Sequence, residues 1–233
     1  MTSGENSSVL LTKPAVVGTV HSPGSLRAAL RLRAGALDFV ELRVDAFADD
    51  PAPLLRAAPR LKVPCLLTVR HPAEGGVNGL STARRRALYA EFLPHAALID
   101  IELRSVEKLA DVIAAARKLG VKIIVSAHDF RRTPSPAQLQ ARIRSAQRAG
   151  ADICKLAALT STAADLQRLL ALFTRRQPLP LSVMGMGAFG KVSRLLLARA
   201  GSVLNYGYLD RPNASGQWEA RVLRERVREL GEG

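Results

Sequence analysis

Short apolar runs alternate with longer segments of helical periodicity along the chain, and this alternation is the feature that most limits its possible folds. Continuous apolar and β-branched runs are typical of strands that are buried on both faces. Eight strands are predicted, at Val16–Val20, Phe39–Arg43, Cys65–Val69, Leu98–Glu102, Lys122–Ala127, Ile153–Leu156, Leu181–Met184 and Val203–Tyr206. Eight helices are expected between and after them, at Ser25–Ala34, Pro51–Ala58, Thr82–Leu93, Ser105–Leu119, Ser135–Ala149, Ser161–Arg175, Lys191–Ala200 and Gln217–Leu230.

Strict alternation of strands and helices predicts an α/β fold with a parallel sheet covered by helices, and eight units are the number that closes a (β/α)8 TIM-type barrel. A doubly wound open sheet is the alternative. No linker or change of composition divides the 233 residues. We therefore expect a single barrel domain at residues 14–233, preceded by a flexible N-terminal tail at residues 1–13.

Residues that favour helix ends support these boundaries. Glycine commonly ends a helix because it adopts the left-handed conformation, and four glycines follow helical segments: Gly35, Gly120, Gly150 and Gly201. Serine often caps a helix N-terminus, and three serines stand where caps are expected: Ser105, Ser135 and Ser161.

The charge is the unusual part of the composition, with 34 Lys and Arg against 20 Asp and Glu and a net charge of +14. The arginines are spread over predicted helices, as at Arg84 to Arg86, without interleaved aromatics, so a solvated basic surface is favoured over nucleic-acid binding. Cys65 and Cys154 lie in apolar runs, where reduced buried thiols are usual. No apolar run or N-terminal segment predicts a membrane helix or a secretory signal, and a cytoplasmic location is expected.

Polar residues end most of the predicted strands, at the rim where barrels carry their chemistry. This pattern predicts a convergent site for an anionic ligand. The residues are Glu41, Arg43 and Asp45, then Thr68, Arg70 and Glu74, then Asp100 and Glu102, then His128 and Asp129, then Lys155, and finally Ser193 and Arg194.

Lys155 is the most informative of these residues, because it is one of only seven lysines and lies inside the apolar run Ile153–Leu159. Burial disfavours a charged ammonium and makes the neutral amine available as a nucleophile toward a carbonyl. A lysine whose head reaches solvent is the alternative. His128 ends the preceding strand, and adjacent strands lie roughly 5 Å apart, so the pair is interpreted as an imine-forming amine with a general acid/base.

Glu74 has two interpretations: a carboxylate that orients the His128 imidazole, or a loop carboxylate paired with Arg70. The histidines show no metal-ligand spacing with the cysteines, so no metal site is expected.

The segment GMGAFG at Gly185–Gly190 matches the G-x-G-x-x-G pattern, with Asp210 downstream. Too little chain follows for a complete nucleotide-binding half. A turn whose amides help to hold an anion beside Arg194 is favoured.

Six motifs in order resemble the type I 3-dehydroquinate dehydratase family, the Schiff-base class of the shikimate pathway. The motifs are ELRVD, TVRHPAEGG, SAHDF, DICKLA, MGMGAFGKVSR and ASGQ, and together they cover nearly the whole chain. The resemblance implies a lyase that converts 3-dehydroquinate to 3-dehydroshikimate without a metal or cofactor. It also implies a homodimer that takes a small anionic substrate and binds neither nucleic acid nor membrane.

The resemblance also implies roles for individual residues. Lys155 would form the imine, His128 would be the general acid/base and Glu74 would orient it. Arg194 would bind the substrate carboxylate with its planar fork. The other residues expected to contact substrate are Thr19, Glu41, Arg43, Arg70, Asn213, Ser215 and Gln217.

The closing segment departs from the family pattern, since NASGQ stands where S-A-P-G-Q or T-A-P-G-Q is usual. Asn213 then takes the position of the family's hydroxyl residue and Ser215 that of its proline. Either residue could supply the missing polar group. Two other functions stay open at this point: a different imine-forming barrel enzyme of class I aldolase type, and a non-catalytic basic barrel that binds anions or nucleic acid.

Overall fold

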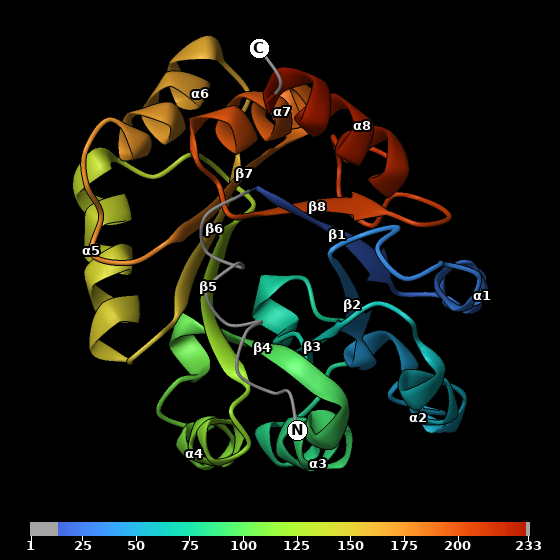
Figure 1. Cartoon of the computed structure of the whole chain (residues 1–233). Coiled ribbons are helices and arrows are strands. Elements are labelled where there is room, and N and C mark those ends of the chain that lie inside the picture. Colours follow the sequence, from blue (N-terminus) through green and yellow to red (C-terminus); the bar gives the residue numbers. More distant parts are fainter. Residues whose placement is uncertain (1–13, 232–233) are drawn as a thin grey trace.

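The computed structural model describes residues 14–231, in which eight central strands are surrounded by helices (Figure 1). The strands are β1 (Ala15–Val20), β2 (Phe39–Arg43), β3 (Cys65–Thr68), β4 (Ala96–Glu102), β5 (Lys122–Asp129), β6 (Ile153–Leu159), β7 (Leu181–Met186) and β8 (Leu204–Tyr208). The α-helices are α1 (Pro23–Leu30), α2 (Ala52–Ala57), α3 (Thr82–Phe92), α4 (Ala110–Lys118), α5 (Pro136–Arg148), α6 (Ala163–Leu170), α7 (Gly190–Ala200) and α8 (Ala220–Gly231). The expected tail at residues 1–13 lies outside the described residues.

The strands are parallel and follow the order β7-β6-β5-β4-β3-β2-β1-β8. Where β7 comes next to β8, the Val203 N–H donates to the Leu181 carbonyl at 2.9 Å and Ser182 Oγ donates to the Leu204 carbonyl at 2.8 Å. The sheet is therefore a nearly closed barrel, which confirms the predicted fold, and the doubly wound alternative is wrong. All eight strands consequently direct their carboxyl ends to one rim.

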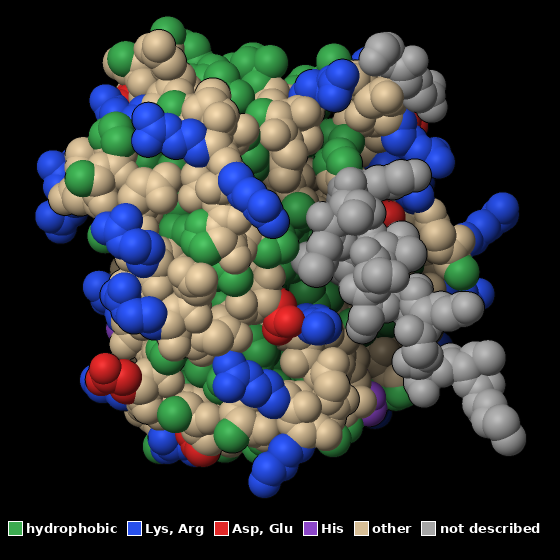
Figure 2. Space-filling model, turned by 60° about the vertical axis from the view of Figure 1, so that its left-hand side comes forward, with side chains coloured by type: hydrophobic (Ala, Val, Ile, Leu, Met, Phe, Trp, Pro, Cys, Tyr) green, Lys and Arg blue, Asp and Glu red, His purple; other side chains and the backbone are tan. Residues whose placement is uncertain are grey.

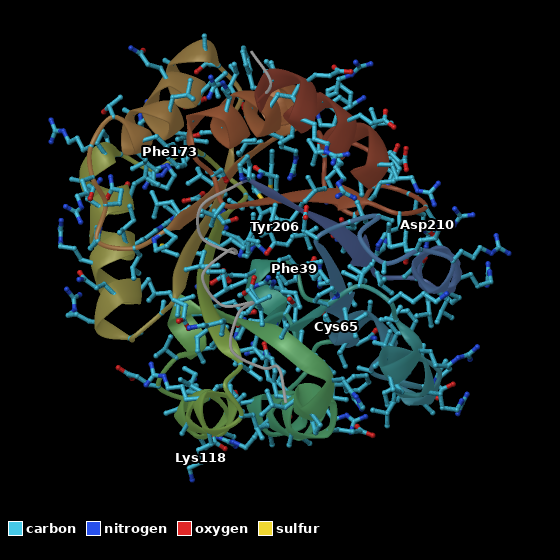
Figure 3. The ribbon with its side chains drawn as sticks, in the orientation of Figure 1. Phe39, Cys65, Lys118, Phe173, Tyr206 and Asp210 are labelled. Atoms are coloured by element: carbon cyan, nitrogen blue, oxygen red, sulfur yellow. The ribbon has the colours of Figure 1, made fainter. Side chains whose placement is uncertain are left out.

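The barrel has two apolar layers, because successive side chains of a strand point to opposite faces of the sheet. Val17 and Phe39 belong to the cluster inside the barrel, whereas their chain neighbours Val16 and Val40 pack in the cluster beneath the helices. Figure 3 shows Phe39 near the barrel axis and Lys118 at the periphery. Each buried large apolar side chain contributes roughly 1.5–3 kcal/mol, so both layers stabilise the rim on which the pocket residues stand.

The predicted helix starts are correct at one serine and wrong at two. Ser135 caps α5 by accepting from the Gln138 N–H, as expected. At α6 the cap is Thr162, one residue after Ser161. Ser105 caps no helix, because it lies in the 3₁₀ turn η6 (Leu103–Ser105) and its Oγ accepts from a buried arginine; α4 begins later.

The predicted helix ends are also partly correct. Gly201 is the C-cap of α7 with φ +118°, and Gly120 and Gly150 follow their helices with φ near +70°. However, α1 ends at Leu30 rather than Ala34, and Gly35 lies in the following loop.

The surface and the thiols agree with the composition. Lys and Arg side chains are scattered across the face seen in Figure 2 rather than gathered in one patch. Cys65 and Cys154 are free and buried, and burial raises the pKa of their thiols to about 11 and about 12. In residues 14–231 no helix has the length and apolar character needed to cross a membrane.

Candidate active site

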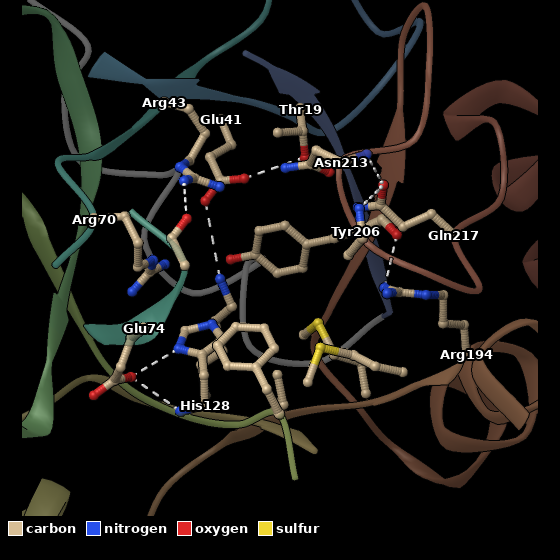
Figure 4. Close-up of a pocket in the computed structure, with 17 residues that line it drawn as sticks. Thr19, Glu41, Arg43, Arg70, Glu74, His128, Arg194, Tyr206, Asn213 and Gln217 are labelled. Carbon is tan, nitrogen blue, oxygen red and sulfur yellow. Dashed lines mark hydrogen bonds and ion pairs between the residues drawn. The ribbon is translucent and has the colours of Figure 1, made fainter. Parts of the chain in front are cut away.

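A pocket opens at the carboxyl ends of the strands, at the rim where barrel chemistry was expected (Figure 4). The predicted residues that line it are Thr19, Glu41, Arg43, Arg70, Glu74, His128, Lys155, Arg194, Asn213 and Gln217. Ser215 is the one predicted site residue that is not among the lining residues. The pocket also has walls that were not predicted: Gly75, Phe130, Ala157, Met184, Met186, Tyr206 and Ala214.

The Lys155 side chain projects from β6 into the pocket and is only 3% exposed. Its Nζ donates to Asp100 Oδ2 at 2.9 Å and lies 3.9 Å from Glu41 Oε1. The same nitrogen lies over the Tyr206 ring, 4.0 Å from its centroid. The strand is apolar, as expected, but the amine itself faces carboxylates and an aromatic ring. The surroundings of Lys155 therefore come from other strands, which the local sequence could not reveal.

Arg70 and Asp100 form the centre of a buried ion-pair network beside the lysine. Arg70 donates from both Nη atoms to Asp100 at 3.0 Å, and from Nη1 to Glu102 at 3.1 Å and to Ser126 Oγ at 2.8 Å. Burial opposes ionisation of Asp100, but Arg70 and Lys155 outweigh it and hold the pKa of this carboxyl well below its usual range. Asp100 is thus a negatively charged partner for the lysine at neutral pH.

Arg85 extends this network from α3, although a surface position is predicted for it. It donates to Glu102 Oε2, to the Val69 carbonyl at 2.8 Å and to Ser105 Oγ at 3.0 Å. The expectation that Arg84 to Arg86 all lie on a solvated surface is wrong for Arg85, which is 1% exposed. The cause is Glu102, whose second oxygen needs a cation that the barrel interior does not supply.

Glu41 and Arg43 end β2 on the opposite side of Lys155. Glu41 accepts from Thr19 Oγ1 at 3.1 Å and from Thr68 Oγ1 at 2.9 Å. Arg43 binds both oxygens of Asp45 at 2.9 and 2.8 Å and donates to the Gly75 carbonyl at 2.9 Å. Asp45 therefore belongs to the support of the pocket.

His128 and Glu74 form a dyad, which decides between the two interpretations of Glu74. Glu74 Oε2 lies 2.9 Å from His128 Nδ1 and accepts from the His128 backbone N–H at 3.0 Å. Its other oxygen pairs with Arg104 at 3.2 Å, and no bond to Arg70 is formed. The 3₁₀ turn η4 (Pro72–Glu74) holds the carboxylate in place and is ended by left-handed Gly75 at φ +84°.

Burial shifts both pKa values in the dyad. It lowers the pKa of His128 well below the ordinary value, assisted by the cations of Arg70 and Lys155. It raises the pKa of Glu74 to about 7. The imidazole is consequently neutral near pH 7 and can accept a proton, and Nδ1 is held by Glu74. Phe130, whose ring is stacked 6.1 Å from the His128 ring, covers the dyad.

Arg194 is a buried cation without a carboxylate partner in residues 14–231. It donates from Nη1 to the Tyr206 carbonyl at 2.9 Å and from Nε to the Gly216 carbonyl at 3.2 Å. Desolvation lowers its pKa to about 10, and no acidic group compensates. A buried guanidinium in this state favours an anionic ligand.

The loop after β8 contributes Asn213 and Gln217 to the pocket. Gln217 Oε1 accepts from the backbone N–H groups of Asn213 at 2.9 Å and Ala214 at 3.3 Å, which leaves its amide NH₂ free to donate. Because Gln217 serves this loop, α8 begins at Ala220 rather than at Gln217. Of the two polar candidates in this loop, the structure brings Asn213 to the pocket.

The glycine-rich turn supports that loop. A Cβ on Gly190 would lie 2.7 Å from the Gly216 Cα, and the Gly187 N–H donates to the Ser215 carbonyl at 3.4 Å. Asp210, the candidate nucleotide-binding acid, instead accepts from Ser22 Oγ at 2.6 Å. The turn therefore packs against the closing loop, beside Arg194. In the described part of the chain, no group of three or more His, Cys, Asp or Glu could hold a metal ion.

Three of the unpredicted wall residues follow from strand geometry. Met184 and Met186 are two residues apart on β7, and Ala157 is two residues after Lys155 on β6, so each pair shares a face. Applying this period of two to every strand end would have found them. Phe130 lies in a loop beyond β5, and no periodic signal in the sequence identifies it.

Known proteins are similar to this chain in both sequence and fold. A model of the family described as type I 3-dehydroquinase matches residues 18–233. The 3-dehydroquinate dehydratase of Methanocella arvoryzae is 35% identical over 219 residues, which cover 94% of this chain and 97% of the relative.

Solved structures of 3-dehydroquinate dehydratases are also similar to this chain in fold. The crystal structure of 3-dehydroquinate dehydratase from Geobacillus kaustophilus has a TM-score of 0.83 at 30% identity and covers 95% of this chain and 92% of that chain. The type I enzyme from Clostridium difficile, solved with covalent modified comenic acid, has a TM-score of 0.85 at 28% identity and covers 95% and 94% of the two chains. By sequence and by fold, this chain belongs to the type I 3-dehydroquinase family.

Proposed function

We propose that this protein dehydrates 3-dehydroquinate to 3-dehydroshikimate through an imine on Lys155, with His128 as the general acid/base. The proposal rests on the groups that one pocket brings together. These are the buried amine of Lys155, the neutral imidazole of His128 held by Glu74, and the buried guanidinium of Arg194, which has no carboxylate partner in residues 14–231. These groups match a substrate with a ketone, an acidic C–H next to it and a carboxylate. The Clostridium difficile relative with covalent modified comenic acid supports covalent chemistry in this family.

The imine acts as an electron sink. Once Nζ of Lys155 has replaced the ketone oxygen, the protonated C=N accepts the electron pair that is left when the neighbouring C–H bond breaks, and the product is an enamine. The negative charge of Asp100, 2.9 Å from Nζ, stabilises the positive nitrogen of the iminium. The enamine then returns its electron pair as the C–O bond to the departing hydroxyl breaks.

His128 moves the proton in both steps. Its pKa lies well below the ordinary value, so it is neutral and takes the proton from carbon. Glu74 stabilises the imidazolium that forms. The imidazolium then gives this proton to the leaving hydroxyl, which departs as water, and the dyad is restored. Hydrolysis of the remaining imine releases the ketone product and the Lys155 amine.

The other pocket residues bind and orient the substrate. Arg194 takes the carboxylate, because its charge has no protein counter-ion. Thr19, Glu41 and Arg43 face the ring hydroxyls from β1 and β2, and Gln217 and Asn213 approach from the loop. Arg70 acts mainly through Asp100, since its Nη atoms are committed to that carboxylate and Glu102.

The proposal includes a cytoplasmic enzyme that works as a homodimer and binds neither nucleic acid nor membrane. The buried free thiols and the scattered basic side chains support the location and the lack of a nucleic-acid surface. The dimer stays a prediction from the family resemblance.

Borohydride reduction in the presence of 3-dehydroquinate tests the proposal. The reduced adduct is expected on the peptide that contains Lys155, measured by intact mass and peptide mapping. The Lys155→Ala variant should give none, whereas Lys122→Ala, which removes a surface ion pair with Asp152, should give a full adduct. His128→Ala should still form the adduct while turnover falls about 10²- to 10⁴-fold. An adduct on any other lysine would contradict the assignment.

A further inference from the structure

The hydroxyl of Tyr206 is an unexplained group in the pocket. Tyr206 is 3% exposed, and its Oη has no hydrogen-bond partner in the described part of the chain. Only one other buried side-chain atom there, Nδ1 of His21, is in this state. Buried polar groups are nearly always paired, and leaving one unpaired is destabilising. An unpaired hydroxyl in a ligand pocket therefore indicates that the ligand supplies the partner.

Three neighbouring hydroxyls, those of Thr19, Thr68 and Ser126, differ from Tyr206 because each donates a hydrogen bond to a carboxylate. Thr19 and Thr68 donate to the two oxygens of Glu41, and Ser126 donates to Asp100 at 2.5 Å. Each is fixed by the protein before a ligand enters. Tyr206 has the same kind of donor without such a commitment.

The position of Tyr206 links the hydroxyl to the reacting nitrogen. Nζ of Lys155 lies over its ring, 4.0 Å from the centroid, so the ring forms one wall of the space in which a bond to Nζ must form. Figure 4 shows the ring in the middle of the pocket, with its hydroxyl turned away from Arg194 and Gln217 toward the side that carries Arg70 and Glu74. The hydroxyl is thus directed away from the cation assigned to the substrate carboxylate.

We propose that the Tyr206 hydroxyl donates a hydrogen bond to the ketone oxygen of the substrate while Lys155 adds to the ketone carbon, so that Tyr206 is a further catalytic residue of imine formation. This inference rests on the proposed role of Lys155. Charge develops on that oxygen as the N–C bond forms, and a positioned donor stabilises it there. The neighbouring walls made by Ala157, Met184 and Met186 offer no side-chain donor for this task.

The step balances with one proton from solvent. The neutral Lys155 amine, the ketone and that proton become a protonated imine and water. The nitrogen lone pair forms the N–C bond as the C=O π pair moves to oxygen, and the C–O bond then breaks as the remaining nitrogen pair completes the C=N. Of the two protons that the departing oxygen gains, one comes from nitrogen and one from solvent.

The electrostatic surroundings keep Tyr206 in the donor form. Burial, together with the nearby charges of Glu41 and Asp100, raises the pKa of its phenol well above the ordinary value. The hydroxyl therefore retains its proton through the working pH range and returns to the same state after each turnover.

Tyr206→Phe tests the inference, because it keeps the ring over Lys155 and removes only the hydroxyl. The rate of borohydride-trappable adduct formation and kcat should fall roughly 10²- to 10³-fold, as for loss of one donor to a developing charge. The melting temperature should stay equal or rise, because an unpaired buried hydroxyl has been removed. Tyr208→Phe, on the same strand but outside the pocket lining, is the matched control and should leave the rates unchanged.

Each outcome has a definite meaning. Wild-type rates in Tyr206→Phe, with a normal adduct on Lys155, overturn the role of Tyr206 and leave the proposed function standing. A lowered melting temperature with lowered rates also overturns it, since the hydroxyl would then have a structural partner. Absence of any Lys155 adduct in the wild-type enzyme overturns the proposed function and this inference together.

Discussion

The two sides of the pocket differ in how far the protein has satisfied its own polar groups. On the side built by β3, β4 and β5, Arg70 pairs with both Asp100 and Glu102, and Arg85 pairs with the second oxygen of Glu102. On the side built by β7, β8 and the following loop, Arg194 is a buried cation without a counter-ion, and Tyr206 has an unpaired hydroxyl.

This difference separates two tasks. The satisfied side holds the charges around Lys155 in a fixed arrangement before substrate arrives, and such preorganisation is what stabilises a transition state. The unsatisfied side carries groups whose partners are missing, and the substrate carboxylate and carbonyl would provide them. Changes to the ion pair between Arg85 and Glu102, which supports the first side, should therefore cost mostly stability, and changes on the second side should cost mostly binding or rate.

Arg85→Met should give the largest effect, a loss of stability, because it removes one ion pair from the side whose polar groups are all bonded. Removing Arg85 leaves the buried Glu102 with fewer partners, and loss of one member of a buried ion pair typically costs roughly 3–5 kcal/mol. The free energy of unfolding, measured with denaturant, should fall by about this amount. Arg86→Met is the matched control, since Arg86 pairs with Asp111 on the surface and should cost less than about 1 kcal/mol. Equal effects of the two changes would contradict the comparison.

Arg194→Met should act on binding instead. A charged hydrogen bond is worth roughly 1.5–3 kcal/mol, so KM for 3-dehydroquinate should rise about 10- to 100-fold. The stability loss should be smaller than for Arg85→Met, because no carboxylate is left unpaired. Arg194→Lys should recover part of the binding by charge alone, without the planar fork. An unchanged KM in Arg194→Met would remove Arg194 from the substrate site.

The titration of Glu74 in the dyad should change kcat/KM by about tenfold. Burial raises the pKa of Glu74 to about 7, so Glu74 gains its charge as the pH rises from 6 to 8. Only the charged form stabilises the His128 imidazolium, and kcat/KM should rise through this range. In Glu74→Gln this step should disappear and kcat should fall. A wild-type profile that is flat between pH 6 and 8 would contradict the assignment.

The fold could be predicted because its signals are local. Apolar runs, glycine stops and the number of units identify the barrel, and all strand boundaries agree to within three residues. The errors come from tertiary partners. Ser105 was expected to cap a helix, but its Oγ accepts from Arg85. Arg85 was expected on the surface, but it is buried and donates to Glu102.

The candidate site was predictable where one residue stands out from its own segment. Lys155 and His128 are visible in this way, and motif order extended the set to Arg194 and Gln217. The sequence showed Asp100 only as a charged residue at a strand end. Its pairing with Lys155 could not be predicted, because the two residues are 55 positions apart and lie on different strands. Tyr206 gave no signal, since a tyrosine in an apolar strand is ordinary until its hydroxyl is found unpaired.

The closing loop should show the smallest effects and sharpen the description of the unsatisfied side. Asn213 lines the pocket and Ser215 does not, so Asn213→Ala should raise KM several-fold, while Ser215→Ala should change it less. Gln217→Ala should raise KM further, because it removes both a pocket amide and the bonds that hold the Asn213 and Ala214 N–H groups. In all three variants kcat should change less than KM, since these residues lie away from the carbon that loses its proton. Steady-state kinetics on the three variants measure this order. A larger effect at Ser215 than at Asn213 would mean that Ser215 supplies the polar group of the loop, and that the loop turns when substrate binds.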